Sequence, residues 1–277
     1  MNNKDRYAVV GHPVAHSRSP FIHARFAEQT HQPLEYGTID AAPAGFEAVV
    51  REFFAAGGKG LNVTVPHKEA AFRLATELTP RAQRAQAVNT LGLAKNGKLL
   101  GDNTDGTGLA RDLLNNQRIA IAGRRLLLLG AGGAARGVLA PLIGLRPSLL
   151  TIVNRTPQRA VELVRMFEDL GPLRAIGHEE LGDETFDIVI NATAASLAGE
   201  VPALPPAIVN AQSICYDMAY ARDDTPFVHW AHQRGVARAV DGLGMLVEQA
   251  AESFHVWRGL RPDTASVLAA LTAELRG

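Results

Sequence analysis

The chain has 277 residues, which is long for one compact core and suits two domains. Lysine plus arginine and aspartate plus glutamate number 28 each, so the net charge gives no reason to expect a nucleic acid or a membrane surface as a partner. A hydrophobic fraction of 47% argues against disorder and allows a large core.

The single cysteine, Cys215, has no second cysteine in the chain for a disulfide, which fits a reducing compartment. It lies in an apolar run, so we expect a buried structural thiol rather than a nucleophile. Residues 1–7 lack the apolar stretch of a signal peptide, and no run of 18 apolar residues suggests a membrane span. These features predict a cytoplasmic protein.

The first polar segment of the chain, residues 11–20, follows a short strand expected at residues 6–10. Within it, Ser17 and Ser19 precede Pro20, a good first residue for a helix over residues 21–29. The two hydroxyls either cap this helix or bind a carboxylate at its N-terminus.

A second polar pattern follows a strand at 34–39 and an amphipathic helix at 44–55. Residues 60–66 alternate the polar side chains of Asn62 and Thr64 with apolar ones, as in a strand, and Pro66 ends it. Lys68 then stands near a helix start, where the helix dipole favours acids. This misfit hints at a function for Lys68, and an ordinary exposed lysine is the alternative.

Residues 87–94 and 98–100 predict paired strands joined by a turn at 95–97. The next segment, Gly101-Asp-Asn-Thr-Asp-Gly106, leads into a helix expected at 107–114. Its polar side chains are either caps for that helix or part of a ligand-facing linker between domains. A metal loop is a third reading, although the segment lacks the further ligands of a calcium site.

A nucleotide-binding pattern occupies the middle of the chain. Four leucines at 126–129 suit a strand buried on both faces, and Gly130-Ala131-Gly132-Gly133-Ala134 matches G-x-G-x-x-A before a helix at 136–143. Glycines at this turn let a pyrophosphate approach the N–H groups of the helix N-terminus. The strand, turn and helix together predict a dinucleotide site.

The next strand, at 149–153, indicates which dinucleotide binds. NAD sites usually place an acid at the end of this strand to hold the ribose 2′-hydroxyl. Here Asn154, Arg155, Thr156 and Arg159 follow the strand, and arginine suits a 2′-phosphate. The sequence therefore favours NADP over NAD, with solvated helix-start arginines as the alternative reading.

Strands and helices then alternate, which predicts a parallel sheet with right-handed crossovers. We expect a helix at 157–170, strands at 186–190 and 213–217, a helix at 226–234 and a strand at 236–240. After a boundary at 241–245, helices at 246–257 and 263–275 have no further strand to accompany. We expect them to return to the N-terminal sheet.

The candidate ligand-binding residues of the first domain are mostly hydroxyls and amides. With Lys68 they suit a small anionic ligand that bears several hydroxyls, and hydride transfer to a ketone also needs a proton donor, which a lysine can be. Asp105 is a candidate partner that holds Lys68 in place. The set consists of Ser17, Ser19, Thr64, Lys68, Asn89, Thr104 and Asp105.

Taken in order, these segments resemble the shikimate dehydrogenase family over nearly the whole chain. The resemblance rests on residues 11–20, 62–68, 87–90, 101–106, 130–134, 154–156, 191–193, 216–218 and 241–245. It implies reversible, NADPH-dependent reduction of 3-dehydroshikimate to shikimate in aromatic amino-acid and chorismate biosynthesis. It also implies that Lys68 is the acid/base residue and Asp105 its paired carboxylate.

The resemblance assigns further residues by position. For the substrate they are Ser17, Ser19, Thr64, Asn89, Tyr220 and Gln249, together with Lys68 and Asp105. The pyrophosphate loop is Gly130, Ala131, Gly132, Gly133 and Ala134; the 2′-phosphate pocket is Asn154, Arg155, Thr156 and Arg159; Met218 and Gly242 lie near the nicotinamide. No metal ligands are implied.

The fold implied is α/β, with an N-terminal substrate domain at 1–104 and a Rossmann-like NADP domain at 105–241. Residues 242–277 would form C-terminal helices that pack on the substrate domain. We expect a monomer or homodimer that binds a small molecule. The alternatives are a quinate/shikimate dehydrogenase with relaxed cofactor use and a non-catalytic ligand sensor on the same fold.

Three positions depart from the family pattern. Ala194-Ala195-Ser196 replaces the usual serine and glycine, so the loop there is expected to differ in shape. His67 stands where an aromatic residue is common and is read either as a titrating neighbour of Lys68 or as a packing replacement. Pro80 occupies an expected polar helix start, where proline is tolerated.

Overall fold

The computed structural model describes residues 4–277, which divide into two compact units. Unit 1 consists of the described residues up to Gly108 and of Val247–Ala273; unit 2 consists of Leu109–Leu246 and Glu274–Gly277. Residues 1–3, which belong to the expected first domain and to the stretch searched for a signal peptide, lie outside the described residues. Among residues 4–277, no helix has both the length and the apolar character needed to cross a bilayer.

Unit 1 contains a mixed six-stranded sheet in the order β2-β1-β3-β5-β6-β4. The pairs β1–β2, β1–β3 and β4–β6 are parallel, whereas β3–β5 and β5–β6 are antiparallel. The predicted hairpin is the antiparallel β5–β6 pair. The strands are β1 (Asp5–Gly11), β2 (Leu34–Asp40), β3 (Gly60–Val63), β4 (Glu77–Leu78), β5 (Thr90–Leu93) and β6 (Leu99–Asp102).

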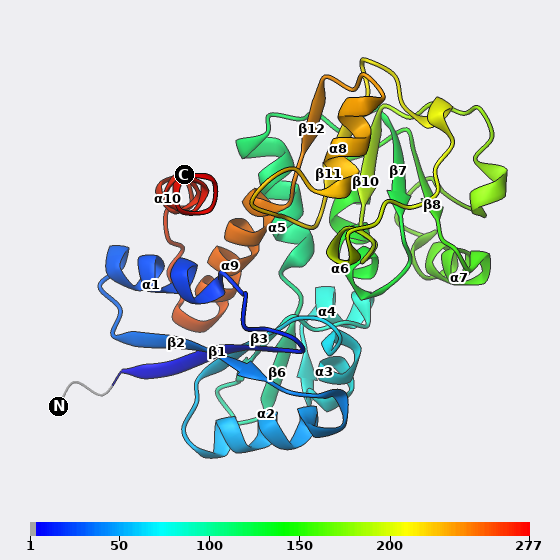
Figure 1. Cartoon of the computed structure of the whole chain (residues 1–277). Helices are drawn as coiled ribbons and strands as arrows, with labels where there is room; N and C mark the ends of the chain where they lie inside the picture. The colour runs from blue at the N-terminus through cyan, green and yellow to red at the C-terminus, as the bar shows by residue number, and fades with distance from the viewer. Residues whose placement is uncertain (1–3) are drawn as a thin grey trace. The chain divides into compact units, whose positions relative to one another are not determined.

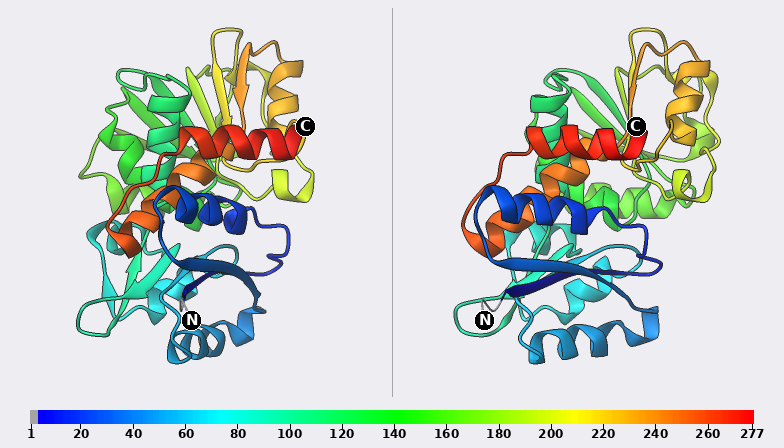
Figure 2. Two further views of the ribbon diagram at one scale, coloured as in Figure 1. Left: turned by 90° about the vertical axis from the view of Figure 1, so that its left-hand side faces the viewer. Right: turned by 60° about the vertical axis from the view of Figure 1, so that its left-hand side comes forward.

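The helices of this unit cover both faces of the sheet. Figure 2 shows α1 and α2 on opposite sides of β1 and β2. Ala8 and Val10 face a core that includes Phe46 of α2, while the neighbouring Tyr7 packs against Trp257 of α9 in a tilted arrangement, 4.8 Å between ring centroids. The helices are α1 (Ser19–Gln29), α2 (Phe46–Ala55), α3 (Lys68–Leu74), α4 (Pro80–Ala85), α9 (Leu243–Arg258) and α10 (Ala265–Arg276).

Unit 2 contains a second six-stranded sheet in the order β12-β11-β10-β7-β8-β9, with every pair parallel. Numbered within the unit, this is the order 3-2-1-4-5-6 read from the opposite edge, which is the order of a dinucleotide-binding fold. The strands are β7 (Arg125–Leu129), β8 (Leu149–Val153), β9 (Leu173–Ile176), β10 (Ile188–Asn191), β11 (Ile214–Asp217) and β12 (Arg238–Val240).

The four leucines of β7 explain why this sheet is covered on both faces. Leu126 and Leu128 belong to the core beneath α6 and α7, whereas Leu127 and Leu129 belong to the core beneath α8. Successive residues of a strand point to opposite faces, so an unbroken apolar run needs two cores. The helices of unit 2, labelled in Figure 1, are α6 (Gly133–Gly144), α7 (Pro157–Phe167) and α8 (Pro226–Gln233); α5 (Asp105–Arg111) begins in unit 1 and ends in unit 2.

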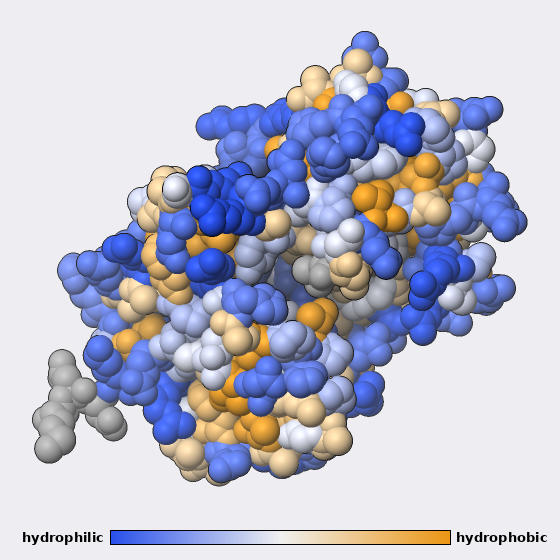
Figure 3. Space-filling model, viewed as in Figure 1, coloured by the Kyte–Doolittle hydropathy of each residue, from blue (hydrophilic) through white to orange (hydrophobic). Residues whose placement is uncertain are grey.

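The α/β fold with its parallel second sheet is confirmed, as is the return of the C-terminal helices, since Val247–Ala273 belong to unit 1. The expected bounds shift at several ends. α5 begins at Asp105 rather than at residue 107 and continues as one π-helical turn, Asp112–Asn116. The short strands β4 and β9 were not predicted. Hydrophilic residues cover most of the face seen in Figure 3, as expected when the leucine- and valine-rich strands are interior.

Candidate active site

The centre of the candidate site is an ion pair within unit 1. Lys68 is the first residue of α3, and its Nζ lies 2.6 Å from Oδ2 of Asp105, the first residue of α5. The Lys68 side chain is 17% exposed and that of Asp105 6% exposed. The fold thus brings together two residues that are far apart in the sequence, and leaves the ammonium partly open while the carboxylate is buried.

Asn89 fixes the other oxygen of this carboxylate. Its Nδ2 donates to Oδ1 of Asp105 at 2.7 Å, and its Oδ1 accepts a hydrogen bond from the backbone N–H of Thr104 at 2.8 Å. Gln249 of α9 joins the same group through its Oε1, 3.3 Å from Nδ2 of Asn89. Lys68, Asn89, Asp105 and Gln249 therefore form one hydrogen-bonded cluster.

This cluster is supported by buried polar residues that were not among the predicted site residues. Ser253 Oγ lies 2.8 Å from Thr90 Oγ1 and accepts from Asn62 Nδ2 at 2.9 Å. Asn62 Oδ1 in turn accepts from the Tyr36 hydroxyl at 2.7 Å. Asn62, Thr90 and Ser253 are buried, so each polar group needs the partner it has. The only sequence pattern that could have indicated these residues was the alternation of polar and apolar side chains at Asn62 and Thr64.

The serine segment lies at the N-terminus of α1. Ser17 Oγ accepts from the backbone N–H of Ser19 at 3.3 Å, and the hydroxyl of Ser19 is hydrogen-bonded to Tyr36. The N-cap residue of α1 is Arg18, which makes no side-chain capping bond, so the reading of Ser17 and Ser19 as the caps of this helix is wrong. Ser19 is connected through Tyr36, Asn62, Ser253 and the threonine hydroxyls to the Asp105 cluster. Thr64 lies against Gly11, where any side chain would overlap the Thr64 methyl group.

His67, a departure from the family pattern, is a packing residue. Its ring stacks on Phe46 at 4.5 Å between centroids and its Nε2 lies 2.7 Å from the carbonyl oxygen of Ala41. The side chain is buried, and its two partners belong to α2 and to the segment after β2. These contacts and the burial fit the reading of His67 as a packing replacement.

The polar segment 101–106 acts partly as a cap. Asn103 Oδ1 accepts from the backbone N–H of Asp105 at 3.2 Å, at the start of α5. Within residues 4–277, no group of three or more histidines, cysteines and acids is placed to hold a metal ion.

The glycine-rich turn of unit 2 follows β7 directly. Gly130 has φ +105°, a conformation that favours glycine, and a side chain there would press on Ala192 and Thr193. Gly132 is the N-cap of α6 and has open space where a Cβ would stand. The first N–H groups of a helix have no partner within the helix, and a glycine-rich turn at such a helix start is typical of pyrophosphate sites.

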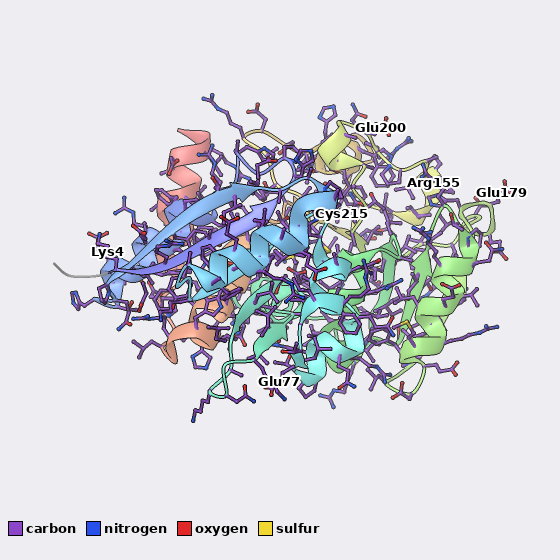
Figure 4. The ribbon with its side chains drawn as sticks, turned by 90° about the horizontal axis from the view of Figure 1, so that it is seen from below. Lys4, Glu77, Arg155, Glu179, Glu200 and Cys215 are labelled. Atoms are coloured by element: carbon purple, nitrogen blue, oxygen red, sulfur yellow. The ribbon has the colours of Figure 1, made fainter. Side chains whose placement is uncertain are left out.

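Beside this turn, the end of β8 carries the residues assigned to a 2′-phosphate. Asn154 Nδ2 donates to the carbonyl oxygen of Thr156 at 2.9 Å, which shapes the turn before α7. Arg155 and Arg159 are exposed, and Figure 4 labels Arg155 at the edge of this unit. The two exposed guanidinium groups and the absence of an acid at residues 154–156 fit NADP rather than NAD.

The ends of β10 and β11 are joined by a buried carboxylate. Asp217 accepts from Asn191 Nδ2 at 3.1 Å, from Ser196 Oγ at 2.5 Å and from Thr225 Oγ1 at 2.7 Å. Burial raises the pKa of Asp217, and these donors oppose the rise. Ser196 belongs to the departing Ala194-Ala195-Ser196 segment, so this loop is anchored to β11 through its own serine.

The remaining predicted residues also belong to unit 2. Met218 and Tyr220 follow β11 directly, and Gly242 donates its N–H to the carbonyl oxygen of Ala219 at 2.9 Å. A side chain at Gly242 would overlap the carbonyl of Met218. The predicted substrate set is divided, since Tyr220 lies in unit 2 and the other members lie in unit 1.

A 3-2-1-4-5-6 sheet with its glycine turn, together with a lysine–aspartate pair, defines an α/β dehydrogenase of the dinucleotide-binding class. Residues 9–91 match the shikimate dehydrogenase substrate binding domain, residues 109–228 the shikimate / quinate 5-dehydrogenase family, and residues 242–272 the shikimate 5′-dehydrogenase C-terminal domain. The chain belongs to the shikimate dehydrogenase family.

Full-length relatives agree. The chain is 58% identical over 271 residues to the shikimate dehydrogenase (NADP(+)) of Aeromonas salmonicida, covering 98% of each chain. The structure resembles that of an Ael1 enzyme from Pseudomonas putida, with a TM-score of 0.90, 46% identity and coverage of 97% and 98%. It also resembles the Thermus thermophilus shikimate 5-dehydrogenase in complex with NADP(H) and shikimate, with a TM-score of 0.85, 34% identity and coverage of 98% and 99%.

Proposed function

We propose that this protein catalyses the reversible, NADPH-dependent reduction of 3-dehydroshikimate to shikimate, with Lys68 and Asp105 handling the proton. The protein is an NADP-dependent oxidoreductase that acts on a CH–OH group, in the pathway to chorismate and the aromatic amino acids. The observation that carries the proton assignment is the 2.6 Å contact between a partly exposed Lys68 Nζ and the buried carboxylate of Asp105.

Lys68 gives its proton to the substrate's ketone oxygen as that oxygen becomes the hydroxyl of shikimate. NADPH held by the turn Gly130–Ala134 and by Arg155 would supply the hydride for the new C–H bond. Asp105 holds the lysine by a charge-assisted hydrogen bond, and Asn89 holds the second carboxylate oxygen, so that the ammonium is oriented before the substrate arrives. Because the Lys68 side chain is 17% exposed, solvent can replace its proton after each turnover.

We assign substrate binding to Ser17, Ser19, Thr64, Asn89, Gln249 and Tyr220, together with Lys68 and Asp105. Hydroxyl and amide groups match a ligand with several hydroxyls and one carboxylate, and Ser19 lies at a helix N-terminus that favours an anion. Ser19, Asn89 and Gln249 are connected by hydrogen bonds through Tyr36, Asn62, Ser253 and Thr104, and this connection supports their assignment because it holds the three side chains in one arrangement.

NADP is assigned to the turn Gly130–Ala134, to Asn154, Arg155, Thr156 and Arg159, and to Met218 and Gly242. The open space at Gly132 and the exposed arginines support this assignment. We assign residues 1–104 to substrate binding, 105–241 to NADP binding and 242–277 to helices of the substrate domain. We further propose that the protein works in the cytoplasm, because its lone cysteine suits a reducing compartment. We also propose that it is a monomer or a homodimer.

The test is oxidation of shikimate by the purified protein, followed by the absorbance of the reduced cofactor. NADP and NAD are compared, and quinate is run in parallel. Turnover with shikimate and NADP well above the other combinations supports the substrate and cofactor assignments. Equal rates with quinate would favour a quinate/shikimate dehydrogenase, and bound NADP without turnover would favour a ligand sensor.

A further inference from the structure

Arg81 stands in the first turn of α4, directly after the unusual Pro80. The helix is capped by Thr79, whose Oγ1 accepts from the backbone N–H of Ala82 at 3.3 Å. The same hydroxyl donates to Oδ1 of Asp102 at 2.5 Å. Proline at the first helical position is preorganised for a helix start. The Thr79 cap and Pro80 together therefore fix the backbone at Arg81 and so the direction of its side chain.

The guanidinium of Arg81 binds Asp102 at two points. Nε lies 2.6 Å from Oδ1 and Nη2 lies 2.6 Å from Oδ2. The Asp102 side chain is 3% exposed. Burial alone would raise the pKa of Asp102, but the hydrogen bonds and charge of Arg81 outweigh it and hold this pKa below its usual value. The carboxylate therefore stays ionised, and the fork geometry sets its orientation.

The remaining nitrogen of the same guanidinium reaches α5 and α9. Nη1 donates to Thr107 Oγ1 at 3.0 Å and to Glu252 Oε1 at 2.8 Å. Glu252 is bound on its other oxygen by Arg261 at 2.6 Å, so its carboxylate is held from both sides. One side chain thus connects the end of β6, the first turn of α5 and the middle of α9.

These contacts lie next to the residues assigned to chemistry. Asp102 Oδ1 accepts from the backbone N–H of Asn103 at 2.7 Å, and Asn103 Oδ1 accepts from that of Asp105 at 3.2 Å. Glu252 follows Gln249 by three residues on α9, and residues at this spacing lie on one helix face. A displacement of Asp102 or Glu252 would therefore move Asp105 or Gln249.

We propose that Arg81 is a positioning residue, which fixes the start of α5 and the adjacent turn of α9 so that the Asp105 carboxylate remains on Lys68. The proposal rests on the proton role given to Lys68 and Asp105. Lysine cannot replace Arg81, because a single ammonium cannot bind both oxygens of Asp102 while also reaching Glu252.

The experiment compares Arg81→Met and Arg81→Lys with Arg51→Met, which removes an exposed arginine of the same unit that pairs with Glu47. All are assayed well below their unfolding temperatures for kcat and for the KM of shikimate and NADP. A small misplacement of a catalytic group costs up to about 100-fold, so kcat should fall roughly 10- to 100-fold in both Arg81 variants. The KM for NADP and the Arg51→Met enzyme should be unchanged.

A double-mutant cycle separates positioning from general loss of structure. If Arg81 acts through Asp105, the Arg81→Met change should lower kcat far less in an Asp105→Asn background than in the natural protein. An equal fold-loss in both backgrounds, or an unchanged kcat in folded Arg81→Met, would overturn the proposal. Asp102→Asn, which keeps the side-chain size, repeats the test if Arg81→Met does not fold.

The cycle also identifies a failure of the proposed function itself. If Asp105→Asn alone leaves kcat unchanged, the proton role of the pair is wrong and the positioning proposal falls with it. If Asp105→Asn lowers kcat but Arg81→Met does not, only the positioning proposal is lost.

Discussion

Both oxygens of the Asp105 carboxylate are occupied by different donors: Nζ of Lys68 at 2.6 Å on Oδ2 and Nδ2 of Asn89 at 2.7 Å on Oδ1. The carboxylate cannot rotate without breaking one of these bonds. Its side chain is 6% exposed, so water does not readily replace a lost partner. The Asp105 carboxylate that binds Lys68 is therefore itself fixed in orientation by Asn89.

Replacing Lys68 by methionine should remove the group that accepts the substrate's hydroxyl proton in oxidation and donates it in reduction, while keeping most of the side-chain volume. General acid–base catalysis contributes about 10²- to 10⁴-fold, so kcat for shikimate oxidation should fall by a factor in that range. NADP affinity, measured by fluorescence titration, should stay unchanged. Lys59→Met, at an exposed lysine of the same unit, is the control. Similar kcat values in the two variants would rule out the acid/base role of Lys68.

The double variant Arg155→Ala and Arg159→Ala should discriminate between the two nicotinamide cofactors. Charge-assisted hydrogen bonds contribute about 1.5–3 kcal/mol each, so the KM for NADP should rise by a factor of ten or more. The KM for NAD, which lacks the 2′-phosphate, should change little. Arg165→Ala, at an exposed arginine farther along α7, is the control. An equal rise for both cofactors would make these arginines structural.

Asp102 should make the stability of unit 1 depend on acid. Its folded-state pKa is lowered from 3.8, so its contribution to the free energy of unfolding is present above the unfolded value of 3.8 and is lost as pH falls from there through the lower folded-state pKa. The unfolding temperature of the natural protein should therefore drop as pH falls below about 5. Asp102→Asn should be less stable at pH 7 and show a shallower drop. Parallel curves for the two proteins would contradict this assignment.

Tyr216 should contribute to the stability of unit 2 through its hydroxyl. This fully buried side chain donates to Oδ2 of Asp112 at 2.6 Å, and Asn116 Nδ2 donates to Oδ1 of the same carboxylate at 2.9 Å. Tyr216→Phe removes one donor from a buried acid, which costs about 1–3 kcal/mol. Urea unfolding should show this loss. A variant as stable as the natural protein would mean that another donor replaces the hydroxyl.

The sequence was sufficient for the elements whose pattern is local. The four leucines before Gly130 predicted a doubly covered strand, and the hairpin turn at 95–97 predicted the β5–β6 pair. The start of α5 was placed two residues late, because the Asn103 side chain caps the N–H of Asp105 and so begins the helix earlier. β9 was missed, since Leu173–Ile176 is partly buried and carries no strong alternation.

The sequence predicted members of the candidate site only where they belong to a recognisable motif. Lys68 stood out because a lysine opposes the dipole at a helix start. Arg81, Glu252 and Ser253 gave no such signal, because their roles depend on contacts across more than 160 residues of sequence. Buried polar networks of this kind are defined by the packed fold, so spacing along the chain cannot indicate their members.

Cys215 lies in β11 with 0% exposure, and burial raises its pKa to about 12. Alkylating reagents attack the thiolate, so the folded protein should be inert to them. Because this is the only thiol of the chain, its labelling would occur when the sheet of unit 2 opens. The rate of alkylation, measured by mass spectrometry, would therefore report how often the nucleotide-binding unit opens. The factor by which NADP slows this rate would measure how strongly the cofactor stabilises that unit against opening.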